Sequence, residues 1–328
     1  YAFLTVENYQ QNQGLPPTSQ AVLDHGTALI ATEIMKLHSR AELERQHVNS
    51  FVEELIAQDF KSDEAMLERA RYLGLNLNQP CLPMVLDVDR FWQNIELEQL
   101  AEEEVQVLKS RLQRTLSSYL KAHCPVPFVV ALRSDSLVIL TAWPPKQLSD
   151  QITASAQELA QDILLELRRS FPELHFTGGI GRPYSGVRNV GRSFVEARKA
   201  ISLGRQAYGR GQVFCYNKLG VYQLLCSHSD QEELIALRDE MLGPLAAYDQ
   251  KQDTNLIDTL AAYFFHNEDI NATAKTLFVH PNTVRYRLER AAELLDCDLG
   301  STDQRFQIYL ALKIASLCPF GANDTSKP

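Results

Sequence analysis

Apolar residues recur at alternating intervals of four and three along a segment near the start of the chain. Seven of the eight positions in this series are apolar. The series is Ile30, Ile34, Leu37, Ala41, Glu44, Val48, Phe51 and Leu55. Such spacing forms one stripe on a helix, a heptad seam. Two interpretations stay open: a signalling helix that pairs with its copy in a dimer, or a helix that packs on its own domain.

Strand-like and helix-like patterns alternate over the next part of the chain. A short helix at 63–73 is expected to end at Gly74. The strands are expected at 82–88, 128–132, 137–142, 174–180 and 213–216, and the helices at 102–120, 154–169 and 190–203. The order β-α-β-β-α-β predicts a ferredoxin-like fold, with an antiparallel sheet and helices on one face. We therefore expect an α+β protein.

From about Asp230 onward the pattern is helical. A helix over 231–242 is expected to end at Gly243-Pro244, because proline breaks a helix interior. The next helix starts near Leu256, with Asp253 or Thr254 as its cap.

A short helix and a longer one complete a helix-turn-helix pattern. The short helix is predicted to begin with Asn271 as its N-cap, and Phe278-Val279 to form the turn. The longer helix starts with Pro281 and runs to about Leu295. This arrangement is typical of DNA-binding domains, although a plain three-helix bundle has the same spacing.

The longer helix is expected to expose donor side chains. Its apolar stripe of Val284, Leu288, Ala291 and Leu295 faces inward, so Asn282, Arg285, Tyr286 and Glu289 face outward. Arginine and asparagine at such positions match base edges or hold phosphates. Asn282 and Arg285 are the expected base readers, and the expected phosphate or sugar contacts are Thr283, Tyr286, Arg287 and Arg290.

Charge restricts how the chain can bind nucleic acid. The net charge of −9 argues against coating DNA through bulk electrostatics, so contact must be local. Residues 281–290 hold three arginines against one glutamate, whereas residues 254–313 hold six basic against eight acidic residues. One copy would bind weakly, which favours a homodimer on paired half-sites of double-stranded DNA.

The segment 271–290 reads NATAKTLFVHPNTVRYRLER. With Asp298-Leu-Gly and Tyr309-Leu-Ala-Leu it resembles the C-terminal helix-turn-helix of the PucR and CdaR regulators, whose pattern is HxNTxRYRLxR. Pro281 stands where those families usually have a basic residue, so we expect one phosphate contact fewer. The resemblance and the helix geometry together give the candidate DNA-binding residues Asn271, Thr273, His280, Asn282, Thr283, Arg285, Tyr286, Arg287 and Arg290.

A second segment, Gly179-Ile-Gly-Arg-Pro-Tyr-Ser-Gly continuing through 192–200, is similar to the degenerate GGDEF-like domain of the same regulators. The resemblance implies transcription control, usually activation, of genes for the catabolism of sugar diacids, purines or amino acids. It also implies a small-molecule effector bound by an N-terminal domain. Because the chain opens with Tyr1 to Val6 and no initiator Met, most of that domain is expected to lie upstream.

Four parts are expected: a remnant of the effector domain with its exit helix (1–40), a helical linker (41–79), a GGDEF-like domain (80–228) and a helix-turn-helix domain (229–328). No apolar run approaches the roughly 20 residues that cross a bilayer, and no signal peptide is recognisable. We expect a cytoplasmic protein without a membrane partner.

Diguanylate cyclases provide the rival, enzymatic interpretation. They hold two metal ions with carboxylates from the first strand and the central hairpin. The strand end Asp87-Val-Asp89-Arg90-Phe91 is similar to theirs, but the hairpin Arg133-Ser134-Asp135-Ser136 lacks the glycine pair. We expect no enzyme, metal or cofactor. A signalling scaffold, whose GGDEF-like domain binds a nucleotide or a protein without catalysis, stays as the alternative.

Glycines and cysteines add no further site. Gly178, Gly179, Gly181 and Gly186 lack the spacing of a phosphate-binding loop, so they predict a tight connection between a strand and a helix. The six cysteines are scattered without metal-ligand spacing, which predicts reduced core thiols.

Overall fold

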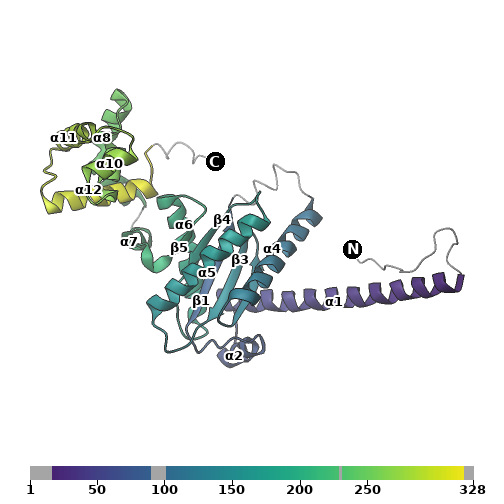
Figure 1. Cartoon of the computed structure of the whole chain (residues 1–328). Helices are drawn as coiled ribbons and strands as arrows, with labels where there is room; N and C mark the ends of the chain where they lie inside the picture. Colours follow the sequence, from purple (N-terminus) through teal and green to yellow (C-terminus); the bar gives the residue numbers. More distant parts are fainter. Residues whose placement is uncertain (1–16, 90–100, 229–230, 321–328) are drawn as a thin grey trace.

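The computed structural model describes residues 17–89, 101–228 and 231–320. A long helix projects from an α/β body, and a helical C-terminal part lies at another end of that body (Figure 1). The expected α+β class is confirmed. The opening segment from Tyr1 to Val6 lies outside the described residues. No helix within the described ranges is both long and apolar enough to span a bilayer.

The projecting helix, α1 (Pro17–Ala57), has different surroundings at its two ends. Phe51 and Leu55 are 1% and 0% exposed in a core, whereas Ile30 and Leu37 are 44% and 61% exposed. The second interpretation, a helix packed on its own domain, is therefore confirmed for the end of α1, and pairing with a second copy stays a prediction. The second half docks on its own domain, and the first half has an uncovered apolar face. The helix begins at Pro17, since proline is favoured in a first helical turn.

The sheet has the strand order β2-β3-β1-β4-β5. Its strands are β1 (Cys81–Val88), β2 (Phe128–Arg133), β3 (Ser136–Ala142), β4 (Phe176–Ile180) and β5 (Val213–Cys215). The central strand β1 is antiparallel to both neighbours, with Val85 opposite Val138 and Gly179. The first four strands thus have the order of the expected ferredoxin-like unit.

Two details of the predicted sheet are wrong. β5 pairs with β4 in parallel, because helix α6 (Asn189–Tyr208) crosses over between them and returns the chain in the same direction. Helices also cover both faces. α4 (Glu102–His123) and α5 (Ser149–Ser170) pack on one face, while α2 (Asp63–Tyr72), α6 and the end of α1 pack on the other. Accordingly, β1 is buried at every residue.

The close approach of α6 to β4 explains two of the glycines. A Cβ at Gly179 would lie 2.2 Å from the Ala197 carbonyl oxygen, and one at Gly181 would lie 2.1 Å from the Ser193 carbonyl oxygen. Any side chain would force the helix away from the sheet. These glycines therefore allow α6 to pack closely on β4, and the expected tight connection between the two elements stays a prediction.

The C-terminal part is entirely helical in the described ranges. It consists of α7 (Val221–His228), α8 (Gln231–Gln252), α9 (Leu256–Phe265), α10 (Ile270–Thr276), α11 (Pro281–Leu295) and α12 (Thr302–Leu317). The predicted helix end at Gly243-Pro244 is wrong, because α8 continues through both residues. Leu242 and Leu245, on either side, are fully buried in one core, and this packing holds the helix across the proline.

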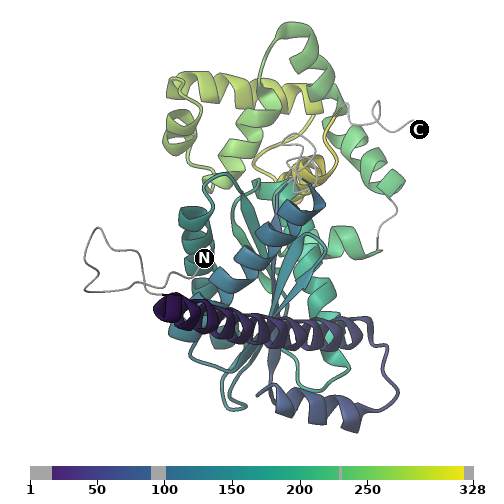
Figure 2. The ribbon, with the colours of Figure 1, turned by 90° about the vertical axis from the view of Figure 1, so that its right-hand side faces the viewer.

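An apolar core joins the C-terminal part to the body. Ile314 and Leu317 of α12 pack with Leu203 of α6 and Phe214 of β5. Helix α6 also contacts α1 on the other side of the body. Figure 2 shows the consequence: the C-terminal helices lie at one end of the sheet and α1 crosses near the other end, with α6 connected to both.

Candidate nucleic-acid interface

Helix α11 lies at the surface of the C-terminal part and packs against α8, α9 and α10. Val284, Leu288 and Ala291 on its inner side are 0%, 7% and 0% exposed. The helix begins at Pro281 and ends at Leu295, as predicted. Its opposite side is therefore the outer face of the domain.

The first turn of α11 is fixed by His280. This residue is the N-cap, and its Nδ1 atom accepts a hydrogen bond from the backbone N–H of Asn282 at 3.2 Å. Pro281 has no N–H group, and the N–H groups of Thr283 and Val284 donate to the His280 carbonyl at 2.9 and 3.3 Å. The structure thus brings His280 to the same end of the helix as Asn282.

Asn282, Arg285 and Tyr286 are all exposed on the outer face, and Tyr286 is 64% exposed. Arg285 donates from Nη1 to the Asn282 Oδ1 atom at 2.8 Å. The amide and the guanidinium are thereby oriented as one unit, with further N–H donors left over on both side chains. Glu289 is exposed one turn further along and adds a negative charge.

The other two arginines of the motif have partners within the chain. Arg287 donates from Nη1 to Thr259 Oγ1 on α9 at 3.3 Å. Arg290 donates to Glu293 at 2.7 Å and stacks over the Tyr248 ring of α8 at 5.0 Å. Both side chains attach α11 to its neighbours, so Arg285 is the arginine of this motif that remains exposed.

The short helix α10 differs from the prediction at its start. Asn271 was expected as the N-cap, but the N-cap is Asp269, whose carboxylate accepts hydrogen bonds from the N–H groups of Asn271 and Ala272 at 2.7 and 2.9 Å. These bonds, the one from Ala272 first, lower the pKa of Asp269. A carboxylate with two such bonds is a stronger cap than an amide. The Asn271 side chain is left exposed.

A similar difference occurs at α9. In place of Asp253 or Thr254, Asp249 of α8 accepts from the N–H groups of Leu256 and Ile257 at 2.8 and 3.0 Å. The cap therefore also joins two helices of the domain.

The exposed residues of α10 differ from the predicted DNA contacts at two positions, Thr273 and Lys275. Thr273 is 0% exposed and donates to the Asp269 carbonyl at 2.7 Å, so the structure does not bring it to the outer face. Lys275 is exposed and makes no ion pair within the described residues, yet the sequence interpretation omitted it. Its position four residues after Asn271, hence on the same side of α10, was the available signal.

The GGDEF-like part has its carboxylates already paired. Asp87 and Asp89, at the end of β1, are 8% and 5% exposed. Arg205 of α6 places Nη1 2.6 Å from Asp87 Oδ2 and Nη2 2.5 Å from Asp89 Oδ1. Thr177 donates to Asp89 at 2.8 Å. The guanidinium occupies the position that a cation would need, so these residues do not fit a metal pair.

Comparison with known proteins identifies two domains. Residues 256–314 match the PucR C-terminal helix-turn-helix domain, and residues 58–203 match the GGDEF-like domain. Both assignments agree with the resemblances recognised in the sequence.

Curated relatives are similar over much of the chain. The Carbohydrate diacid regulator of Escherichia coli is 28% identical over 80% of this chain and 65% of its own length. The Proline-responsive transcriptional activator PutR of Bacillus subtilis is 26% identical over 62% of this chain and 49% of its own. The Purine catabolism regulatory protein of B. subtilis is 25% identical over 97% and 60%. The chain thus spans about half to two thirds of these relatives.

Among solved structures, a regulator of polyketide synthase expression from Bifidobacterium adolescentis aligns with 82% of this chain and 97% of its own, at 16% identity and a TM-score of 0.34.

Proposed function

We propose that the chain is a helix-turn-helix transcriptional regulator of the PucR and CdaR kind with a GGDEF-like domain, and that it binds double-stranded DNA through the outer face of α11. The observation that supports this most is the exposed pair of Asn282 and Arg285, joined by a hydrogen bond at the start of a surface helix. Side chains at this point of a recognition helix reach base edges in the major groove.

Within the interface we assign base reading to Asn282 and Arg285. Tyr286, Thr283 and His280 lie beside them and are assigned to phosphate or sugar, as are Asn271 and Lys275 on α10. Arg287 and Arg290 are assigned a positioning role, because both are held against neighbouring helices. Thr273 is left out, because it is buried.

We propose that the regulator acts in the cytoplasm as a homodimer controlled by a small-molecule effector, and that it activates catabolic genes. The names of the relatives refer to a carbohydrate diacid, proline and purine catabolism. The uncovered apolar half of α1 supports pairing with a second copy. The parts proposed for the chain are an effector-domain remnant (1–40), a linker (41–79), a GGDEF-like domain (80–228) and a DNA-binding domain (229–328).

The contacts of α6 suggest how a signal would travel. This helix touches α1 and also packs against α12. A change in how two α1 helices pair would therefore move α6 and, with it, the DNA-binding helices. Because half-sites lie about one helical turn apart, the spacing of two α11 helices decides affinity.

We infer that the GGDEF-like domain is not a cyclase. Arg205 neutralises the carboxylates that a metal-dependent reaction would need. Because Asp87 and Asp89 are already paired, they offer no binding site for the nucleotide or protein partner of the alternative signalling scaffold.

The test is selection of bound fragments from genomic DNA with the purified chain, followed by affinity measurements on the fragment recovered. We expect one or a few sequences with paired half-sites, bound with an affinity that falls steeply as salt increases. Recovery of no fragment above background would contradict the proposal.

A further inference from the structure

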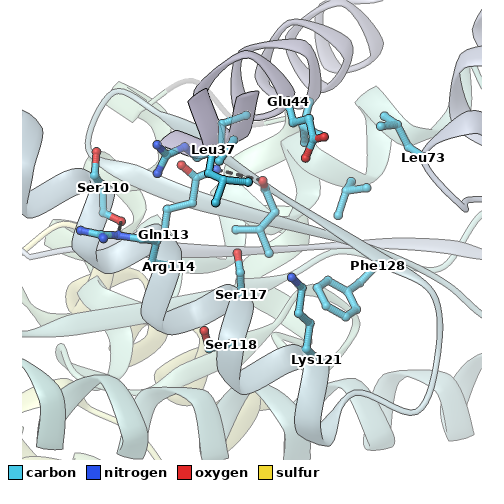
Figure 3. Close-up of a pocket in the computed structure, with 15 residues that line it drawn as sticks. Leu37, Glu44, Leu73, Ser110, Gln113, Arg114, Ser117, Ser118, Lys121 and Phe128 are labelled. Atoms are coloured by element: carbon cyan, nitrogen blue, oxygen red, sulfur yellow. Dashed lines mark hydrogen bonds between the residues drawn. The ribbon is translucent and has the colours of Figure 1, made fainter. Parts of the chain in front are cut away.

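A groove of about 760 Å³ lies between α1 and α4, over the edge strand β2 (Figure 3). Phe128 and Val129 of β2 lie along its floor, and Leu37 and Val48 of α1 lie along one wall. This part of the body is on the side away from the C-terminal helices (Figure 1). The groove is independent of the proposed DNA interface.

The α4 wall of the groove is polar. Four of its side chains recur at intervals of three, one and three residues, which places them on one side of the helix. They are Arg114, Ser117, Ser118 and Lys121. At 1.5 Å per residue, the two cationic residues are roughly 10 Å apart along the helix axis. In Figure 3, Ser117 and Lys121 point toward the gap below α1, beside the ring of Phe128.

The positive charges of this wall are not paired with a carboxylate of the described residues. Arg114 donates from Nε to the Ser110 carbonyl at 3.3 Å, and neither Arg114 nor Lys121 forms an ion pair within the described residues. Glu166 borders an adjoining hollow with Arg114 and accepts a hydrogen bond from Ser170, but it forms no ion pair with Arg114. Unpaired cations beside an apolar floor leave donors that an anion could satisfy.

The α1 wall does not supply the missing negative charge. Glu44 lines the groove, but its carboxylate pairs with Arg40 at 3.3 Å on the exposed surface of α1. Arg45 lines the groove as well and pairs with Glu42. Its Nε atom is buried without a hydrogen-bond partner in the part of the chain described. An unsatisfied buried donor is costly, so this atom is a second sign of a missing acceptor.

We propose that the groove binds a small organic oxyanion, that is, a molecule with a carboxylate or phosphate group on an apolar body. The charged group binds Lys121 and Arg114, with serine hydroxyls as further donors. The apolar body lies over Phe128 and the aliphatic side chains of α1. A mainly apolar cavity with a few convergent polar groups, in the range of about 300–1,000 Å³, is typical of small-molecule sites.

Occupation of this site has a structural consequence. The ligand touches α1 and α4 together, so it holds α1 against the body at the point where the helix begins to project. A bound oxyanion therefore limits the directions that the free half of α1 can take.

The test is calorimetric titration of the purified chain with phenylacetate and with phenyl phosphate, compared with the neutral isostere phenylacetamide. We expect saturable binding of at least one anion, and at least tenfold weaker binding of the amide. The two anions distinguish a carboxylate site from a phosphate site. Lys121→Gln and Arg114→Gln should each weaken anion binding about tenfold, as expected for loss of one charge-assisted contact. Lys146→Gln, at an exposed loop position, is the matched control.

Two results would overturn the proposal. Equal binding of the anions and phenylacetamide would mean that the groove recognises only apolar surface. No binding of any probe would also overturn it, and a dimer that Ser117→Phe disrupts would then mean that a second copy of the chain occupies the groove. None of these measurements involves DNA. A negative result would therefore overturn the proposed oxyanion site without affecting the DNA-binding proposal.

Discussion

The guanidinium of Arg205 on α6 lies 2.5 Å from the carboxylate of Asp89 at the end of β1. The same side chain contacts Asp87 at 2.6 Å, so one cation joins two nearly buried carboxylates to a helix. Arg205 therefore connects the sheet to α6, the helix that contacts both α1 and α12.

Removing this cation should destabilise the body. In Arg205→Ala two carboxylates stay in a buried site without their partner, and breaking a buried pair costs about 3–5 kcal/mol. Urea unfolding of the purified chain measures the loss. Arg210→Ala, at an exposed position two residues past the end of α6, is the control and should change the free energy of unfolding little. Equal effects of the two substitutions would show that the ion pairs contribute nothing.

Asp87 should make stability depend on pH in a defined direction. Burial raises the pKa of this carboxyl, and Arg205 offsets only part of that effect. A raised folded-state pKa means that the folded protein holds the proton more tightly than the unfolded chain. The stabilisation is complete below the unfolded value of about 3.9, and it is lost as the pH rises through the folded value.

Asp87→Asn lacks this titration. The stability of the wild type minus that of the variant should therefore fall as the pH rises from about 4 toward neutrality. Urea unfolding at a series of pH values gives this difference. A difference that grows with pH would instead mean that Arg205 holds the pKa of Asp87 below its usual range.

Several parts of the fold could be predicted from the sequence because their causes are local. The apolar stripe of α11, Pro281 at its start and Gly74 after α2 depend on residues within a few positions of one another. The Arg205–Asp89 pair and the Asp249 cap could not be predicted, since each joins residues from different elements. For the same reason the sequence predicted the outer face of α11 but not that Arg287 is held by Thr259. The end predicted for α8 failed because tertiary packing outweighed the local effect of Pro244.

Phe278 carries a local strain that can be measured. It lies in the turn before α11 with a φ of 55°, in the left-handed region, and its ring is 95% exposed. Phe278→Gly should be about 1 kcal/mol more stable than Phe278→Ala, because only glycine avoids the Cβ penalty of this conformation. Thermal unfolding of both variants provides the comparison. Equal stability would show that the turn relaxes when the ring is removed.

The exposed half of α1 should mediate self-association. Ile30 and Ile34 lie on the apolar seam, so Ile30→Asp places a charge within any paired interface and should weaken the dimer at least tenfold, a cost of about 1.4 kcal/mol or more. Sedimentation of the purified chain measures this. Ser39→Asp, on the opposite side of the helix, should leave the dimer intact. A wild-type chain that stays monomeric at micromolar concentration would contradict pairing through α1.

The DNA-binding role of α11 is tested most directly by fluorescence anisotropy on the fragment recovered from genomic selection, with the wild type and Arg285→Ala compared over a series of salt concentrations. Loss of one base-reading side chain should cost about 1–3 kcal/mol and relax specificity at one position. Arg210→Ala is the matched control, because this exposed arginine lies outside the DNA-binding domain. We expect a wild-type affinity that falls steeply with salt, an Arg285→Ala affinity at least fivefold lower, and an Arg210→Ala affinity close to that of the wild type. Identical affinities for the wild type and Arg285→Ala at every salt concentration would contradict it.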